Sequence, residues 1–285
     1  ANNGVGVAGV AFNAKIMAVK GLDNMGNGGY ADLAAAVIYA ADNGADVINA
    51  SWGGTVSDIV LSNAVAYAQS HGVVFVAAAG NSNADVSGFY PASYSGVIAV
   101  AATDSGDNRA TFSNWGSRID VSAPGVSIYS TKPGASYGYL QGTSMASPHV
   151  AGLAALILSQ HSSYTPEQVR QTLRRTADDV GPSGFDTQAG YGRINALKAL
   201  QAATPLNLVI TSPAQFAPIS GTVEVRGTAE GSPLASRRLE YGAGTTPATY
   251  LPLGNSSADP VTNGSLGFWN VNALTEGLYS LRLVG

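Results

Sequence analysis

Short, wholly apolar runs alternate with helix-like stretches over the first 203 residues of the chain. The runs VVFVAAAGN and GVIAVAATD lack an alternating polar face, which is typical of strands buried on both sides. The stretches YADLAAAVIYAAD and DIVLSNAVAYAQS have helical patterns and stop near Gly44 and Gly72. Such strands occur in parallel sheets covered by helices. Residues 1–203 therefore predict a three-layer α/β domain with a mainly parallel sheet.

Four further elements complete the expected organisation of this domain. AKIMAVKGL, residues 14–22, and the run ADVINA before Ser51 have the composition of strands. The apolar stretch from Ser144 to His161 predicts a long helix. TPEQVRQTLRRTA predicts an amphipathic helix with Thr165 as its N-cap and Pro166 at its first position.

The pattern changes at Thr204-Pro205. Residues 204–285 lack helical periodicity and contain short apolar runs separated by turn signals such as Asn263-Gly264. This arrangement predicts a small all-β sandwich that follows the α/β domain. The chain stops at Gly285 directly after a strand-like run, which leaves open whether the sandwich has a further strand.

Composition excludes several classes of function. The chain has 45% hydrophobic residues, 11% charged residues and a net charge of −4, without a basic patch, so nucleic acid is not an expected partner. It has no continuous apolar run long enough for a membrane-spanning helix. It also has no cysteine, which excludes a disulfide framework and a thiolate metal site.

The stretch GTSMASPHVAG, residues 142–152, places one serine at the start of the long apolar helix. Backbone N–H groups at a helix N-terminus are unpaired and lie at the positive end of the helix dipole. They can stabilise the oxyanion that forms when a nearby hydroxyl attacks a carbonyl. Ser144 is therefore a candidate nucleophile, although most serines at such positions are simply N-caps.

GTSMASPHVAG as a whole resembles the serine motif of the subtilisin-like serine proteases. ADVINASWGG, VVFVAAAGN and YPASYSGVIAVAATD also resemble segments of that family, in the same order, and LDNMGNGGY is similar to its thermitase-like branch. The resemblance covers the first domain. It implies a subtilisin-like fold and a secreted, monomeric endopeptidase that cleaves proteins or peptides through an acyl-enzyme.

The resemblance implies roles for individual positions. Ser144 would be the nucleophile, and Asn81 would donate its side-chain amide to the oxyanion together with the backbone N–H of Ser144. Two backbone segments would bind an extended peptide, and three small residues would line a primary specificity pocket suited to a large apolar side chain. These residues are Gly26, Asn27, Gly28, Ser51, Trp52 and Gly53 for the two segments, and Ala78, Ala79 and Gly80 for the pocket.

Phe89 lies at the expected floor of this pocket, directly before Tyr90-Pro91. Family members often have a smaller residue there, so the depth of the pocket stays open. The Tyr90-Pro91 bond matches a cis peptide bond of the family.

Two calcium sites are also implied by the resemblance. Both would consist of backbone carbonyls with one side-chain oxygen ligand, a donor set that suits a hard cation. The first site would be incomplete here, because the family adds ligands from further upstream. The implied ligands are Ala1, Asn3, Val5 and Val7 for the first site, and Ala92, Tyr94, Val97 and Asp120 for the second.

The base and the acid of a catalytic triad are harder to place. The family order along the chain is Asp, His, Ser, so both would precede Asn2. The histidines are His71, His149 and His161, and none lies in the HGTHVAG context of the family. The sequence is thus interpreted as a partial peptidase domain without its Asp and His portion. The alternatives are a pseudoprotease, or half of a two-chain assembly that acts as a peptide-binding module.

The β-rich C-terminal part shows a weaker resemblance. Its runs LEYGAG, NGSLGFWNV and LTEGLYSLRLV are similar to the immunoglobulin-like or fibronectin-like domains appended to secreted bacterial hydrolases. The resemblance implies a spacer, with binding to a substrate or cell surface as the alternative.

We predict that the purified chain alone does not hydrolyse casein at a measurable rate, because a serine hydroxyl without a general base is a poor nucleophile. The measurement is casein hydrolysis by the chain and by its Ser144→Ala variant. Hydrolysis that disappears on this substitution would contradict the prediction.

Overall fold

The computed structural model describes residues 4–285 apart from 215, 233 and 246. The chain divides into two compact units, Ala1–Ala202 and Ala203–Gly285. They are named the N-terminal unit and the C-terminal unit, and each is described by itself.

The N-terminal unit is built on a four-stranded sheet in which every neighbouring pair is parallel. The strands lie in chain order, so β1 is at one edge and β4 is at the other. Val47 lies opposite Val74, and Ala77 lies opposite Ala99. The strands are β1 (Val47–Ala50), β2 (Val74–Ala78), β3 (Ile98–Thr103) and β4 (Val121–Pro124).

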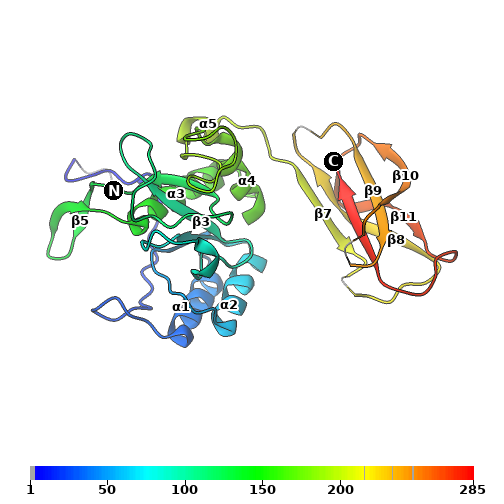
Figure 1. The fold of residues 1–285 in the computed structure, drawn as a ribbon, viewed down its shortest axis with the longest axis horizontal. Helices are drawn as coiled ribbons and strands as arrows, with labels where there is room; N and C mark the ends of the chain where they lie inside the picture. The colour runs from blue at the N-terminus through cyan, green and yellow to red at the C-terminus, as the bar shows by residue number, and fades with distance from the viewer. Residues whose placement is uncertain (1–3, 215, 233, 246) are drawn as a thin grey trace. The chain divides into compact units, whose positions relative to one another are not determined.

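Helices cover both faces of this sheet (Figure 1). Alternate strand residues face two separate cores: Phe75 and Ala77 pack with α1 and α2, whereas Val74 and Val76 pack with α3 and α4. Every residue of β2 and β3 is buried. The predicted three-layer α/β fold with a parallel sheet is confirmed. The helices are α1 (Tyr30–Asp42) and α2 (Ile59–Ser70) on one face, and α3 (Thr143–Gln160), α4 (Pro166–Thr176) and α5 (Ala196–Leu200) on the other.

Local signals define where α4 begins. The hydroxyl of Thr165 accepts a hydrogen bond from the backbone of Gln168 at 3.2 Å, and the Gln168 side chain accepts one from the backbone of Thr165 at 2.9 Å. Pro166 is the first helical residue, where its missing N–H costs nothing. The predicted cap is confirmed.

The run from Ala14 to Leu22, predicted as a strand, forms none in the structure. A strand needs a ladder partner, and β1, whose edge is close by, pairs only with β2 among the described residues. A cavity lies between β1 and this run, and Ile16 is 88% exposed. The prediction was wrong because an apolar pattern reports a tendency to be buried and does not supply the partner.

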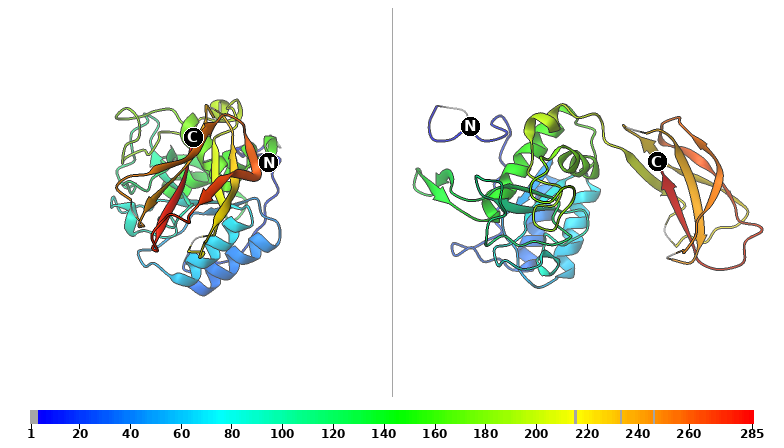
Figure 2. Two further views of the ribbon diagram at one scale, coloured as in Figure 1. Left: turned by 90° about the vertical axis from the view of Figure 1, so that its right-hand side faces the viewer. Right: turned by 45° about the horizontal axis from the view of Figure 1, so that its top comes forward.

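A hairpin that the sequence did not indicate projects from the N-terminal unit (Figures 1 and 2). Its antiparallel strands are β5 (Ile128–Lys132) and β6 (Ser136–Leu140). The ring of Tyr129 contacts those of Tyr137 and Tyr139. The strand β4 was not predicted either, because its four residues are too short to show a period.

The longest helix, α3, has 18 residues and packs Val150, Leu153 and Ile157 against the sheet. No helix in the described part of the chain combines the length and the apolar character needed to cross a bilayer.

The C-terminal unit consists of two three-stranded antiparallel sheets with the orders β10-β9-β12 and β11-β8-β7. Val225 and Leu266 of one sheet pack with Leu239 of the other in a single apolar core, which agrees with the predicted all-β class. The strands are β7 (Asn207–Ser212), β8 (Thr222–Glu230), β9 (Arg237–Ala243), β10 (Leu251–Ser257), β11 (Val261–Asn270) and β12 (Tyr279–Val284).

Asn263-Gly264, predicted as a turn between strands, lies inside β11. Asn263 has a φ of 49°, and the register with β8 shifts between Val261 and Gly264, which marks a β-bulge. The backbone N–H of Asn263 donates to the hydroxyl of Thr228 at 3.1 Å. The dipeptide therefore indicated a left-handed backbone but not a chain reversal.

We expect Asp178→Asn to destabilise the protein by about 1 kcal/mol at pH 7, after allowance for solvent screening. Lys198, Arg193 and Asn195 all donate to this carboxylate, and these bonds, led by that of Lys198, lower its pKa to about 2. A lowered pKa stabilises the folded state above the unfolded pKa, and this stabilisation disappears as the pH falls towards 2.

Thermal unfolding between pH 7 and pH 2 measures this effect. The matched control is Asp179→Asn, because the partner of Asp179 is a backbone N–H rather than a cation. An equal loss of stability for Asp178→Asn at every pH would show that the charge is not responsible.

Candidate active site

Ser144 is the second residue of α3, and Gly142 is the N-cap of this helix. The hydroxyl of Ser144 donates to the carbonyl of Ser51 at 3.1 Å instead of capping the helix. The first N–H groups of a helix have no intrahelical acceptor, so the N–H of Ser144 can donate to a ligand. The simple N-cap interpretation therefore does not describe Ser144.

Two N–H donors flank the same small space in front of Gly142. A Cβ atom placed on Gly142 would lie 3.4 Å from Asn81 Nδ2 and 3.7 Å from the backbone nitrogen of Ser144. Gly142 has a φ of 147° and no side chain, so this space stays open. Asn81 Nδ2 and the N–H of Ser144 therefore border the same open space, as an oxyanion-binding site requires.

Thr143 orients the Asn81 amide. Its backbone N–H and its hydroxyl donate to Asn81 Oδ1 at 2.8 and 2.9 Å. Because Oδ1 is engaged, Nδ2 is the end of the amide that remains free to donate. The Thr143 hydroxyl in turn accepts from the N–H of Gly80 at 3.1 Å. The sequence assigned no role to Thr143, although it lies within the serine motif.

Asn49 and Asn114 are two further polar residues that sequence reasoning missed. Asn49, on β1, accepts from Ser147 at 2.7 Å and donates to Ser51 at 3.0 Å, which links α3 to the end of β1. Asn114 is buried, and its Oδ1 accepts from two N–H groups of the loop that follows Asn81. The sequence signal that could have revealed Asn49 was a polar side chain within the apolar run VINA. The sequence around Asn114 contains no comparable signal.

The three histidines contact groups other than the hydroxyl of Ser144. The Nδ1 atom of His149 lies 2.8 Å from the carbonyl of Met145. His71 bonds to the carbonyl of Tyr67, and the ring of His161 stacks on Tyr164. This agrees with the sequence argument that His149, five residues after Ser144, points to another side of the helix.

The two predicted peptide-binding segments line one pocket of about 190 Å³. Gly26, Asn27 and Gly28 form part of one side, and Trp52 and Gly53 form part of the other. The third member of the second segment, Ser51, donates its hydroxyl to the carbonyl of Ser144 at 2.8 Å. The structure therefore brings the two segments together, with Ser51 in contact with Ser144.

The predicted pocket residues follow one another at the end of β2. Ala78 and Ala79 are buried, and the N–H of Ala79 donates to Val100. Gly80 has a φ of 103°, and a Cβ atom on it would lie 2.3 Å from Asn114 Nδ2, so only glycine fits. The neighbouring Tyr90-Pro91 bond is cis, as expected.

The first implied calcium site falls partly outside the described residues, because these exclude Ala1 and Asn3. The side chains of Val5 and Val7 are 61% and 36% exposed. The described residues contain no cluster of three or more His, Cys, Asp or Glu side chains that could hold a metal ion.

The second implied calcium site depends on Asp120, whose carboxylate is already engaged. Its Oδ1 accepts from Arg174 Nε at 2.7 Å and lies 3.8 Å from Arg170, and its Oδ2 accepts from the N–H of Ala99 at 2.8 Å. The residues expected to give the carbonyls, Ala92, Tyr94 and Val97, are buried. Two guanidinium groups oppose a further cation, so this carboxylate does not fit a calcium site.

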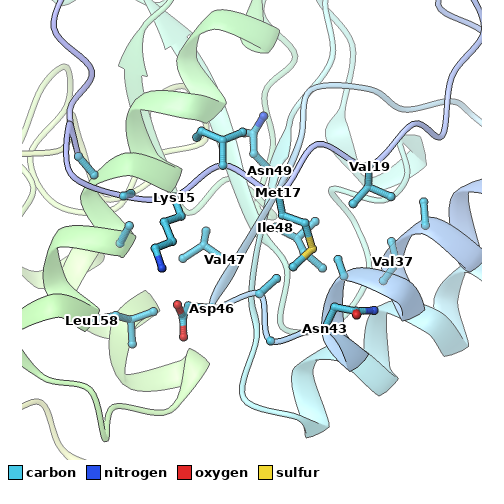
Figure 3. Close-up of a pocket in the computed structure, with 18 of the residues that line it drawn as sticks. Lys15, Met17, Val19, Val37, Asn43, Asp46, Val47, Ile48, Asn49 and Leu158 are labelled. Carbon is cyan, nitrogen blue, oxygen red and sulfur yellow. The ribbon is translucent and has the colours of Figure 1, made fainter. Parts of the chain in front are cut away.

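A cavity of about 1440 Å³ lies along the free edge of β1 (Figure 3). Apolar residues of both helix layers line it, among them Val37 of α1 and Leu158 of α3. Met17 and Val19 form part of the outer wall, and Asn49 lines the cavity from β1. Apolar residues lie on both sides of this cavity, as they do around a strand that is buried on both faces.

Comparison of the sequence with known proteins identifies one family. The model of the subtilase family, a peptidase family, matches residues 1–192. The thermophilic serine proteinase of Bacillus sp. strain AK1 is 52% identical over 199 residues, which are 70% of this chain and 48% of the relative. Thermitase of Thermoactinomyces vulgaris is 50% identical over 200 residues, 70% of each chain. This chain thus spans about half the length of the first relative.

A solved structure of a protease from Pseudoalteromonas arctica shares the fold, with a TM-score of 0.65 and 39% sequence identity. The likeness covers 70% of this chain and 66% of that protein. The family match, the two close relatives and the arrangement around Ser144 agree. The chain belongs to the subtilase family of serine peptidases.

Proposed function

We propose that this chain carries the nucleophile and the oxyanion-binding groups of a secreted, monomeric subtilisin-type endopeptidase. The observation that carries the proposal is the pair of donors, Asn81 Nδ2 and the N–H of Ser144, that flank one open space in front of Gly142. A donor pair beside a serine at a helix N-terminus fits acyl transfer.

In the proposed reaction, the Ser144 oxygen adds to the carbonyl carbon of a peptide. The carbonyl oxygen takes up negative charge and accepts hydrogen bonds from Asn81 and from the Ser144 N–H. A base removes the hydroxyl proton and then protonates the leaving amine, which gives the acyl-enzyme. His149 is held by Met145, so we propose that residues outside this chain supply the base and its acid.

The substrate would lie extended between Gly26–Gly28 and Ser51–Gly53. Backbone groups of both segments would pair with the backbone of the peptide, which gives affinity without selecting a sequence. The shared pocket of about 190 Å³ between these segments supports this placement. Ala78 to Gly80 would form one wall of the primary specificity pocket.

A second candidate function is that of a peptide-binding partner in a two-chain assembly. The cavity of about 1440 Å³ along the edge of β1 favours it, because a strand added there would continue the sheet. The carboxyl end of such a parallel strand would lie at the same edge as Ser51, and so near Ser144. A catalytically inactive pseudoprotease would bind peptide in the same cleft.

Calcium remains part of the proposal only at the first site, where Val5 and Val7 would offer carbonyl oxygens together with Ala1 and Asn3. A bound cation would fix the fold of that loop, and no catalytic step depends on it. The chemistry around Asp120 argues against the second site.

Refolding the chain with the thermitase segment that carries the Asp and His of the family tests the proposed activity. We expect casein hydrolysis to appear in the mixture and to be abolished by Ser144→Ala. Asn81→Ala should lower turnover by about 10²–10³-fold, a range known from a subtilisin, because one oxyanion donor is lost.

The matched control is Ser159→Ala, which changes another serine of α3 whose hydroxyl donates only to the preceding turn. This variant should retain full activity. If a folded mixture cleaves casein equally well with Ser144→Ala, Ser144 is not the nucleophile.

We expect Arg174→Met to lower the free energy of unfolding by about 3 kcal/mol, because it leaves the buried carboxylate of Asp120 with a weaker counter-charge. The loss lies at the low end for a buried pair because Arg170 remains 3.8 Å away. Urea unfolding with and without calcium measures it. The control is Arg118→Met at an exposed position. If calcium stabilised the unmodified chain but not Asp120→Asn, the carboxylate of Asp120 would be a calcium ligand and our interpretation would be wrong.

A further inference from the structure

Phe89 lies between Gly53, in the second peptide-binding segment, and Gly80, in the proposed primary specificity pocket, and we take these two residues as the walls of that pocket. A Cβ atom placed on Gly53 would lie 2.8 Å from the Cζ atom of the Phe89 ring, and its contact with Cε1 would be shorter still. A Cβ atom placed on Gly80 would lie 3.2 Å from Cδ1 of the same ring. The ring therefore packs directly against the backbone of both glycines and fills the space between them.

Both walls are attached to the loop that carries the nucleophile. Ser51, two residues before Gly53, exchanges hydrogen bonds of 2.8 and 3.1 Å with Ser144. Gly80 donates its N–H to the hydroxyl of Thr143 at 3.1 Å. The space occupied by the ring is thus next to Ser144, where the side chain beside the bond to be cleaved would enter.

Hydrogen bonds fix the backbone on both sides of Phe89. The N–H of Phe89 donates to the carbonyl of Val86 at 2.8 Å. The next residue, Tyr90, exchanges two hydrogen bonds of 2.8 Å with Gly54. Phe89 also packs against the apolar core below α2. Moving the ring out of the space between Gly53 and Gly80 would break these packing contacts.

We propose that Phe89 closes the primary pocket, so that this site accepts glycine or alanine beside the cleaved bond and rejects large apolar and aromatic side chains. This inference rests on the proposed function and reverses the sequence expectation of a pocket for a large apolar residue. A large side chain would have to displace the ring, and forcing extra atoms into a packed site costs about 1–3 kcal/mol. That cost corresponds to roughly a 10- to 100-fold preference for the small residue.

Peptide binding to the full chain tests the inference without requiring catalysis. The probes are N-acetyl-Ala-Ala-Pro-Ala and N-acetyl-Ala-Ala-Pro-Phe, titrated into the isotope-labelled protein and followed by amide chemical shifts. We expect the unmodified chain to bind the peptide ending in alanine at least tenfold more tightly. Phe89→Gly should reverse the preference, and Phe89→Leu should give an intermediate ratio while retaining more of the apolar contacts.

Phe185→Ala is the matched control, since it removes a phenylalanine ring that contacts Tyr191 elsewhere in the same unit. Its preference should equal that of the unmodified chain. Equal binding of both peptides by the unmodified chain, or the same ratio in all Phe89 variants, would overturn the inference.

A second probe, fluorobenzene observed by fluorine NMR, distinguishes failure of the inference from failure of the proposed function. We expect fluorobenzene to bind Phe89→Gly and not the unmodified chain, because deletion of the ring leaves an apolar cavity of matching shape. If neither peptide binds any variant but fluorobenzene binds Phe89→Gly alone, the proposed peptide cleft is wrong and the filling of the pocket by Phe89 stands. If fluorobenzene also fails to bind the folded variants, the inference is wrong.

Discussion

The hydrogen bonds between Ser51 and Ser144 join the central sheet to α3, and the rest of the candidate site depends on this junction. The two residues are 93 positions apart in the sequence. A second connection, from Asn81 after β2 to Thr143 in α3, spans 62 positions. Because parallel strands present their carboxyl ends at one edge of the sheet, the first turn of α3 meets both strand ends together. Ser144 and Asn81, the proposed nucleophile and oxyanion donor, are therefore held at the end of the sheet by hydrogen bonds.

The cleft beside this junction is built mostly from backbone. A side chain on Gly53 would collide with the Phe89 ring, and one on Gly80 would collide with the amide of Asn114, whereas Gly142 leaves open the space beside Asn81 and Ser144. Such a surface suits a substrate recognised through its own backbone, since any sequence offers the same groups. Selectivity then depends on the few side chains that reach the cleft. We propose that Phe89 sets it, because its ring packs against both Gly53 and Gly80.

One edge of the central sheet is covered by other backbone, whereas the other edge is open. At one edge, backbone bridges from Ser122 of β4 to Arg193 cover the strand, and Asp120 attaches α4 through Arg174. At the other edge, β1 lines a large cavity between the two helix layers. Unpaired strand edges attract further strands. The open edge is also the one whose carboxyl end lies next to Ser144.

The sequence by itself determined the helices α1 to α4, the strands β1 to β3 and the identity of the serine motif, because periodicity and capping residues such as Thr165 act locally; it did not indicate β4 or α5. It could not determine that the run from Ala14 to Leu22 lacks a ladder partner, or that Asn263-Gly264 forms a bulge, since both depend on neighbouring strands. Only the tertiary structure decided that Thr143 orients Asn81, that Arg174 neutralises Asp120 and that the Phe89 ring packs between Gly53 and Gly80. These contacts join residues far apart in the chain, and a linear pattern carries no information about which distant side chains share a space.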